Sequence, residues 1–205
     1  MIQTESEKQE RFMACLTPCL ARLSRFCHAL TKDGVDDRSS TENGRDLLSD
    51  AILLAYENFD TLRAPEAFTS YIFITARRLY YRRERRKKIW GVFGSDAEQI
   101  IDDRTTAPDV RLDLEALDRA LAQLPEKQRE AVILFEISEL SLKEICKIQG
   151  GSLSGVKSRI VRGREKLAEL LGERESRLPD GGATRRADIT SFQRSGAIAF
   201  MREKV

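Results

Sequence analysis

The stretch that decides the fold lies in the last third of the chain, where residues 141–167 read SLKEICKIQGGSLSGVKSRIVRGREKL. Gly150 and Gly151 divide it, and glycine accepts positive φ without steric cost. The apolar residues before them fall on one side of a helix: Leu142, Ile145 and Cys146. The pattern predicts a helix-turn-helix, with 141–148 as the support helix and 153–170 as the recognition helix.

The second helix of this pair has two different faces. Ser152 or Ser154 can cap its start by accepting a hydrogen bond from a free backbone N–H. Its apolar residues recur at four, three, four and three positions: Val156, Ile160, Gly163, Leu167 and Leu170. The opposite face carries Ser154, Lys157, Ser158, Arg159 and Arg162. A solvated amphipathic helix would also look like this, but the paired helices, glycine turn and basic face together favour DNA binding in the major groove.

Length and charge narrow the class of protein. A chain of 205 residues suggests one or two domains. The formal net charge of +2 says little about partners. The local distribution says more, because basic residues cluster at 77–88 and 157–166 while acidic residues gather at 96–118.

Membrane insertion and secretion are not expected. No apolar run approaches the roughly 20 residues that a membrane helix needs. The first residues, MIQTESEKQERF, are charged and lack the apolar core of a secretory signal. We therefore expect a cytoplasmic protein without membrane insertion.

Four cysteines raise the question of a metal or redox site. Cys15 and Cys19 would share a helix face, and Cys27 precedes His28, the only histidine. Zinc sites usually contain tight CxxC pairs, which are absent, so small buried side chains in a reducing compartment are the favoured interpretation. We expect no metal and no cofactor. No catalytic constellation is visible either, so an enzyme is not expected.

Periodicity predicts an all-α protein made of two small helical domains joined by a flexible linker. A loop is expected at 31–44, a linker at 89–111 and a tail of unknown role at 172–205, where glycine, proline and polar residues are frequent. Pro65 suits the first position of a helix. The expected helices span 8–30, 46–59, 66–88, 112–123, 126–138, 141–148 and 153–171.

The segment 60–88 combines aromatic and basic residues in the manner of a single-strand binding surface. Its aromatic residues are Tyr71, Phe73, Tyr80 and Tyr81, beside Arg77, Arg78, Arg82, Arg83, Arg85 and Arg86. Core packing is the alternative for Tyr71 and Phe73, and we prefer it for at least one of them. Tyr80 and Tyr81 diverge by about 100° on a helix, so they cannot both lie on one buried stripe.

Several short motifs resemble bacterial RNA polymerase sigma factors, and most closely their extracytoplasmic-function (ECF) group. The C-terminal promoter-binding domain of that family is resembled by Leu124-Pro125, Gln128-Arg129-Glu130, Leu140-Ser141, Glu144-Ile145 and Val156-Lys157-Ser158-Arg159. Asp46-Leu47 and the helix through Tyr56 resemble the polymerase-docking helix of the N-terminal domain. Phe68 to Arg78 resembles its promoter-opening helix. Together the matches cover roughly residues 12–171.

The resemblance implies a function. Such a protein binds core RNA polymerase through its clamp and flap regions and has no catalytic activity of its own. It directs promoter-specific transcription initiation, reading the −35 element as duplex and the −10 element as melted single strand. Residues 8–88 would form the N-terminal domain, 89–111 the linker and 112–171 the C-terminal domain. An anti-sigma factor or other regulator would hold it inactive.

The resemblance also implies site residues. The −35 element would be bound by Ser152, Ser154, Lys157, Ser158, Arg159 and Arg162. The −10 element would meet Thr61, Leu62, Arg63, Ala64, Tyr71, Arg77, Arg78, Tyr81, Arg82 and Arg85, with the loop at 61–64 holding a flipped base. Polymerase would be contacted by Asp46, Asp50, Leu53 and Tyr56, while Leu47 and Ile52 pack inward. In the linker, Asp96, Glu98, Asp102 and Asp103 would mimic nucleic acid near the polymerase active centre, or would simply be solvated.

Two glycines depart from the family pattern. Gly151 stands where the turn usually has an apolar residue, and Gly155 where the recognition helix usually begins with Thr. Two other functions stay open at this point. One is a stand-alone helix-turn-helix regulator that binds operator DNA as a dimer. The other is a small interaction protein that sequesters a partner through its basic helix.

Overall fold

The regular secondary structure of the described residues is all helical. The computed structural model describes residues 5–32, 37–62, 64–90 and 108–175, and within these ranges it contains helices and no strands. The prediction of an all-α fold is confirmed. The central part of the expected linker, 91–107, and the tail from residue 176 lie outside the described residues.

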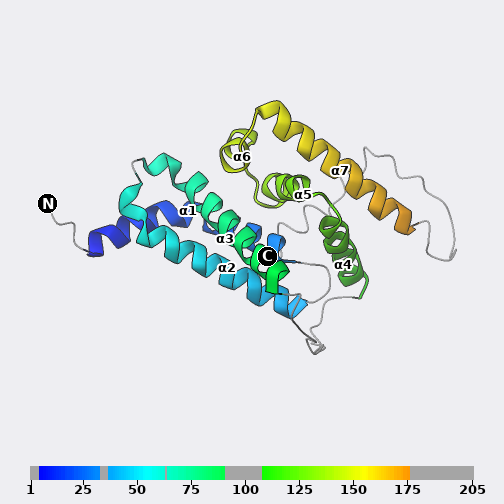
Figure 1. Cartoon of the computed structure of the whole chain (residues 1–205), viewed down its shortest axis with the longest axis horizontal. Helices are drawn as coiled ribbons and strands as arrows, with labels where there is room; N and C mark the ends of the chain where they lie inside the picture. Colours follow the sequence, from blue (N-terminus) through cyan, green and yellow to red (C-terminus); the bar gives the residue numbers. More distant parts are fainter. Residues whose placement is uncertain (1–4, 33–36, 63, 91–107, 176–205) are drawn as a thin grey trace.

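Three long helices form the N-terminal domain (Figure 1): α1 Glu5–Thr31, α2 Asp37–Glu57 and α3 Phe68–Trp90. Two short 3-10 turns, η1 Phe59–Thr61 and η2 Pro65–Ala67, connect α2 to α3. Pro65 takes the first position of its turn, as expected from its fixed φ. Aromatic rings join the helices: the ring of Phe12 packs edge-on against those of Phe59 and Phe68, at centroid separations of 5.3 and 5.5 Å.

The start of α2 corrects the predicted loop at 31–44. The helix begins at Asp37, nine residues before the expected Asp46. Gly44 lies inside it and faces α1, where a Cβ atom would come within 2.4 Å of the His28 Nδ1. The segment is polar and contains a glycine, so its sequence predicts a loop. In the structure, Gly44 allows the helix to pack closely against α1. That approach is a tertiary contact without a hydrophobic period.

The C-terminal domain contains α4 Pro108–Ala122, α5 Glu126–Val132, the π-helix η4 Ile133–Ile137, α6 Leu142–Gln149 and α7 Leu153–Glu175. The expected helix over 126–138 is thus an α-helix that widens into a π-turn. The expected linker at 89–111 is shorter than predicted, because α3 runs to Trp90 and α4 begins at Pro108. Proline suits a first helical turn, where its missing N–H has no intrahelical partner.

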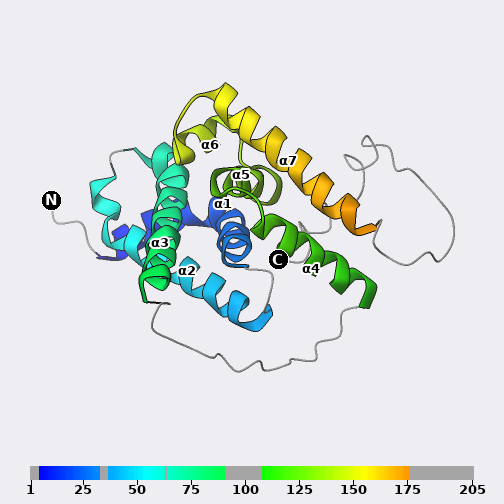
Figure 2. The same cartoon turned by 45° about the vertical axis from the view of Figure 1, so that its right-hand side comes forward.

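The two domains pack against each other along one side (Figure 2). One continuous hydrophobic cluster includes Leu23 and Phe73 from the N-terminal domain and Leu134, Ile145 and Val156 from the C-terminal domain. A second, smaller cluster holds α4 against α5 and α7 through Leu121, Leu124 and Leu167. The helix-turn-helix is therefore held beside α3 by shared packing as well as by chain connection.

Helix α7 packs so closely on α5 that Gly163 has no room for a side chain. A Cβ atom there would lie 2.7 Å from the Val132 Cγ2, inside any normal contact distance. We expect Gly163→Ala to lower the free energy of unfolding by about 1–2 kcal/mol, since overpacking outweighs the gain in helix propensity. Gly172→Ala is the matched control, because nothing lies within 4 Å of a Cβ there. It should stabilise by about 0.5–1 kcal/mol in the same urea titration. Equal effects at both sites would contradict this packing.

Candidate nucleic-acid interface

The helix-turn-helix has the geometry that the sequence predicts. Ser141 caps α6 in a capping box, where its hydroxyl accepts from the Glu144 N–H and the Glu144 carboxylate accepts from the Ser141 N–H. The turn follows at Gly150 and Gly151, whose φ values are +75° and +95°. Ser152 then accepts a hydrogen bond from the Gly155 N–H at 3.1 Å. Of the two candidate caps, Ser152 therefore makes the capping bond.

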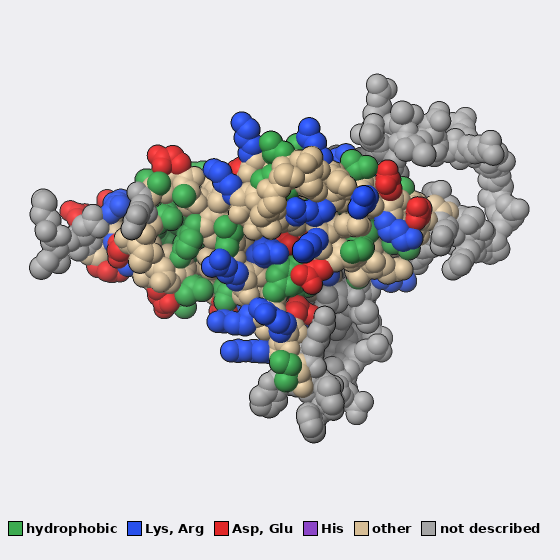
Figure 3. Space-filling model, turned by 45° about the horizontal axis from the view of Figure 1, so that its top comes forward, with side chains coloured by type: hydrophobic (Ala, Val, Ile, Leu, Met, Phe, Trp, Pro, Cys, Tyr) green, Lys and Arg blue, Asp and Glu red, His purple; other side chains and the backbone are tan. Residues whose placement is uncertain are grey.

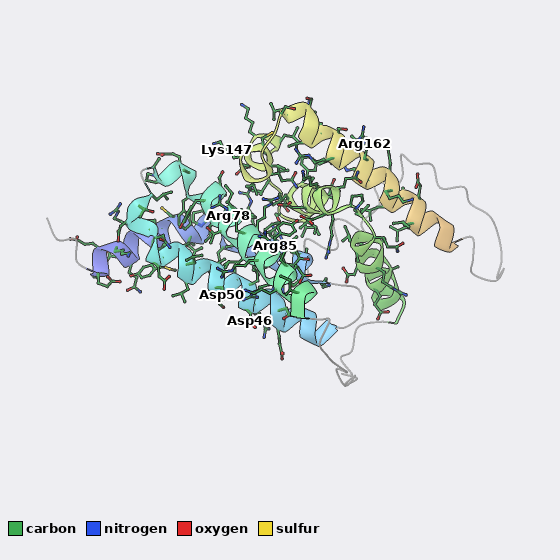
Figure 4. All side chains as sticks on the ribbon, viewed as in Figure 1. Asp46, Asp50, Arg78, Arg85, Lys147 and Arg162 are labelled. Carbon is green, nitrogen blue, oxygen red and sulfur yellow. The ribbon has the colours of Figure 1, made fainter. Side chains whose placement is uncertain are left out.

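One face of α7 is open to solvent beside this turn. Ser154, Lys157 and Arg162 are exposed, and Ser158 is half-buried. Val161 lies between them with 49% of its surface exposed. Basic side chains gather along the middle of the face seen in Figure 3, and Figure 4 places Arg162 on α7 and Lys147 on α6. The buried residues of α7 lie on the other side and include Val156 and Ile160.

Arg159 differs from its neighbours, because its side chain turns back onto the glycine turn. Its guanidinium donates to the Gln149 Oε1 and to the Gly150 carbonyl, the latter at 3.0 Å. Gln149 in turn donates to the Lys127 carbonyl at 3.2 Å. Arg159 thus ties α7 to the end of α6, an arrangement that the position of Arg159 on the polar face did not predict.

Helix α3 presents two basic faces. Arg78, Arg82 and Arg85 recur at four and three positions and are all exposed. Figure 4 shows Arg78 and Arg85 on this helix. Arg77 and Tyr81, also four apart, face the C-terminal domain instead. The sequence placed all five residues in one DNA-binding set, and the structure separates them.

Glu130 of α5 occupies the inner face of α3. The Arg77 Nε donates to its Oε1 at 2.5 Å, and the Tyr81 hydroxyl donates to its Oε2 at 3.3 Å. Glu130 is fully buried, and burial raises the pKa of its carboxyl above the ordinary value while Arg77 opposes that rise. Burial also raises the pKa of Tyr81, with the Glu130 charge acting in the same direction. Two of the predicted −10 residues are therefore bound by a carboxylate from the other domain.

The remaining predicted −10 residues lie in the connection between α2 and α3 or near the start of α3. Thr61 is exposed, whereas Leu62 and Ala64 are half-buried, and Arg63 lies outside the described residues. Tyr71 is half-buried against the hydrophobic core. Phe73 is fully buried, so the core-packing alternative holds for it. Tyr80 is buried and Tyr81 half-buried, consistent with their divergence around the helix.

The predicted polymerase-docking residues share one side of α2. Asp46 and Asp50 are exposed, and Figure 4 shows them along the edge of the molecule away from Arg162. Leu53 has 58% of its surface exposed. Asp50 also pairs with Arg83 of α3 at 2.5 Å. Tyr56 is half-buried, packs against Phe12 and donates a hydrogen bond to Glu5. As expected, Leu47 is fully buried and Ile52 packs on the core.

Most of the hydrogen bonds between the domains run from an arginine to a backbone carbonyl. Arg22 of α1 donates to the Ser138 carbonyl at 3.0 Å, and Arg25 donates to the Ile137 carbonyl at 2.9 Å. In the other direction, Arg129 of α5 donates to the carbonyls of Leu30 and Lys32, at 3.0 and 2.7 Å. Each domain thus caps the C-terminal end of a helix in the other, where unpaired carbonyls carry partial negative charge.

Sequence reasoning missed this interface. Arg129 and Glu130 belong only to a family motif in the sequence, and no pattern there singles out Arg22 or Arg25. One signal was present: Glu130 immediately precedes the apolar run 131–135, so it lies on the edge of a buried face. A carboxylate in such a position needs a partner.

Two of the four cysteines are small buried side chains, as the sequence analysis favours. Cys19 and Cys27 are buried, and burial raises the pKa of the Cys27 thiol to about 12. Cys15 and Cys146 are half-buried, and all four thiols are free. Across the described residues, no three metal-ligating side chains cluster in a way that could hold an ion. None of the helices described here has the length and apolar character needed to cross a membrane.

A fold of this kind, with a helix-turn-helix beside a basic helix, has well-characterised relatives. Residues 114–167 match the family "Sigma-70, region 4". The chain is 30% identical to the ECF RNA polymerase sigma factor EcfG of Rhodopseudomonas palustris over 145 residues, which are 70% of this chain and 76% of that protein. It is 31% identical to SigW of Bacillus subtilis over 144 residues, which are 64% of this chain and 77% of that protein.

A solved structure supports the same relationship. The sigma factor RpoE of Bartonella quintana, crystallised with the anti-sigma factor NepR, is 26% identical and superposes with a TM-score of 0.60. The match covers 82% of this chain and 98% of that one, so it includes both domains. The chain belongs to the ECF group of bacterial RNA polymerase sigma factors, which act in transcription initiation.

The buried contact at Glu130 generates a second prediction. We expect Glu130→Ala to weaken the interface between the domains by about 1–3 kcal/mol, because the donors on Arg77 and Tyr81 lose their acceptor. The loss stays below that of a fully buried pair because a quarter of the Arg77 side chain is exposed to water. Small-angle scattering of the free protein should then show a larger radius of gyration.

The control for this variant is Glu126→Ala, which removes an exposed carboxylate from the same helix. It should leave the radius of gyration unchanged. A Glu130→Ala protein that keeps the compact dimensions of the wild type would show that the carboxylate does not hold the domains together.

Proposed function

We propose that this protein binds core RNA polymerase and directs promoter-specific initiation, with α7 reading the −35 element as duplex and α3 meeting the −10 element as melted single strand. The two promoter-binding domains comprise α1 to α3 and α4 to α7, and the segment between Trp90 and Pro108 links them. The observation that carries the proposal is the pair of exposed basic faces: Lys157 and Arg162 beside the helix-turn-helix, and Arg78, Arg82 and Arg85 on α3.

The chemistry of the two faces differs in the way that the two promoter elements require. Recognition helices present basic and hydroxyl side chains to base edges and phosphates in the major groove, as Ser154, Lys157 and Arg162 can. Single-strand capture depends on a basic track and aromatic stacking. The arginines of α3 supply the track, and Tyr71 and Tyr81 are half-buried aromatic residues of the same helix.

Arg77 and Tyr81 add a conformational requirement. Because Glu130 holds both, they reach a DNA strand only after the C-terminal domain moves away from α3. Arg78, Arg82 and Arg85 need no such movement. We therefore propose that the closed form is the free state of the protein and that binding to polymerase separates the two domains.

The docking surface for polymerase is the exposed side of α2. Asp46 and Asp50 flank an apolar patch made by Leu53 and Leu54, whose exposed fractions are 58% and 36%. Exposed apolar side chains with a polar rim are typical of protein interaction sites. A second partner is an anti-sigma factor, which we propose by analogy with the complex of the Bartonella quintana relative.

Run-off transcription with purified core polymerase and a genomic promoter library tests this function directly. Promoter-specific transcripts that depend on the added protein would support it. Absence of any such transcript across salt conditions, with polymerase active on a control sigma factor, would contradict it. Sequence-specific binding of a dimer without polymerase would favour the stand-alone regulator instead.

For the duplex contact, we expect Arg162→Ala to weaken binding of the holoenzyme to the upstream element by about 1–3 kcal/mol, the range for a good base contact. Lys166→Ala is the control, because Lys166 lies one turn further along α7 and pairs with Glu169. Competition assays with intact and scrambled upstream elements would measure both. Loss of discrimination in the control but not in Arg162→Ala would remove Arg162 from the site.

For the single-strand contact, we expect the double change Arg78→Ala and Arg82→Ala to slow open-complex formation and to flatten its salt dependence. Each lost phosphate contact on a single strand lowers the logarithmic salt slope by about 0.7. Permanganate footprinting at several salt concentrations provides the measurement. Arg119→Ala on α4 should behave as the wild type. Normal melting with impaired duplex binding would contradict the assignment of α3.

A further inference from the structure

A cationic cavity lies at the junction of the two domains. It is lined by Arg77, Lys127, Gln149, Gly150, Gly151 and Arg159, and its volume is about 320 Å³. Its walls come from α3, α5, the end of α6, the glycine turn and α7. Three of its six lining residues carry positive charge, and no carboxylate lines it. A volume of this size lies at the lower end of the range for small-molecule sites.

We propose that this cavity is a binding site for an oligophosphate group, supplied either by a nucleotide or by inorganic polyphosphate, and that the bound anion stabilises the closed arrangement of the domains. Anion binding is a second role for Arg77 and Arg159, which the family resemblance assigns to promoter contact. The proposal follows from the charges, because three cationic side chains line the same cavity when the domains are closed.

The cavity keeps an excess of positive charge, which favours the binding of an anion. Glu130 pairs with Arg77 on the buried side, so it neutralises one of the three cations. Lys127 and Arg159 remain as lining charges that no carboxylate of the cavity wall offsets. Like charges around a partly enclosed space repel each other more strongly than in water, and a multivalent anion removes that repulsion. Phosphate oxygens accept hydrogen bonds from arginine and lysine with charge assistance.

Two of the three cationic groups are also held in place before any ligand arrives. The Glu130 carboxylate orients the Arg77 guanidinium, while Gln149 and the Gly150 carbonyl orient that of Arg159. Gly151 leaves room for Arg159, since a Cβ there would come within 3.0 Å of the Arg159 Nη2. The glycine that departs from the family pattern thus permits this arginine position. Preorganised groups lose less entropy on binding, which favours affinity.

The cavity depends on how the two domains are arranged. Arg77 belongs to the N-terminal domain, whereas Lys127 and Arg159 belong to the C-terminal domain, so the complete site exists only when the domains are closed. A ligand that binds one of two states shifts the equilibrium toward that state. If the proposed function holds, the bound anion keeps Arg77 away from the promoter strand and lowers initiation.

The test uses the full chain without polymerase or DNA, so its result is independent of the transcription experiments. Isothermal titration at low salt would compare tripolyphosphate, ATP and adenosine. We expect tripolyphosphate and ATP to bind and adenosine not to bind. Tighter binding of ATP than of tripolyphosphate would identify a nucleotide, and the reverse would identify inorganic polyphosphate.

Three variants separate the cavity from general attraction to basic surfaces. Lys127→Ala should weaken tripolyphosphate binding by about tenfold, since it removes one charge-assisted contact. Lys143→Ala, an exposed lysine of α6 outside the cavity, should change it by less than about twofold. Arg22→Ala should also weaken binding, because Arg22 holds the domains together without lining the cavity. Equal affinities for Lys127→Ala and Lys143→Ala, unchanged affinity in Arg22→Ala, or no binding to the wild type would each overturn the proposal.

Discussion

Helix C-termini leave carbonyl groups that must find donors, and in this protein each domain supplies them to the other. Arg22 and Arg25 of α1 cap the end of η4, while Arg129 of α5 caps the end of α1. These bonds set the angle and register at which the domains meet. Glu130 then lies against α3, and the helix-turn-helix comes beside Arg77. The closed shape therefore combines the shared hydrophobic cluster with a few charged side chains that bind backbone dipoles.

An interface of this composition is suited to opening. Arginine to carbonyl bonds exchange readily for bonds to water, so they favour one geometry without making separation costly. Apolar packing also crosses the junction, because Leu134 and Ile145 belong to the same continuous cluster as Phe73. Interfaces between domains of one chain are commonly of this polar type, and relative motion is the usual consequence. The buried Glu130 is the exception, because its charge requires Arg77 as long as the domains stay closed.

The same interface divides each basic helix into an outer and an inner part. On α3 the outer residues Arg78, Arg82 and Arg85 remain in solvent, whereas the inner residues Arg77 and Tyr81 bind Glu130. On α7, Lys157 and Arg162 face outward and Arg159 turns toward the glycine turn. A charged side chain on a polar helix face therefore has two possible roles. Contact with nucleic acid is one, and holding the protein's own architecture is the other.

Sequence alone determined the helical class, the helix-turn-helix and its turn, because these follow from local periodicity, capping residues and glycines with positive φ. Ser141 and Ser152 cap the helices that follow them, and Gly150 forms the turn with a positive φ. The early start of α2 at Asp37 and the separation of Arg77 from Arg78 were decided only by tertiary structure. Gly44 is helical because it fits against His28, and Arg77 faces inward because Glu130 is buried opposite it. His28 and Glu130 are distant in sequence from the residues they contact. A periodic pattern shows which face of a helix a residue occupies, but not which part of the protein packs against that face.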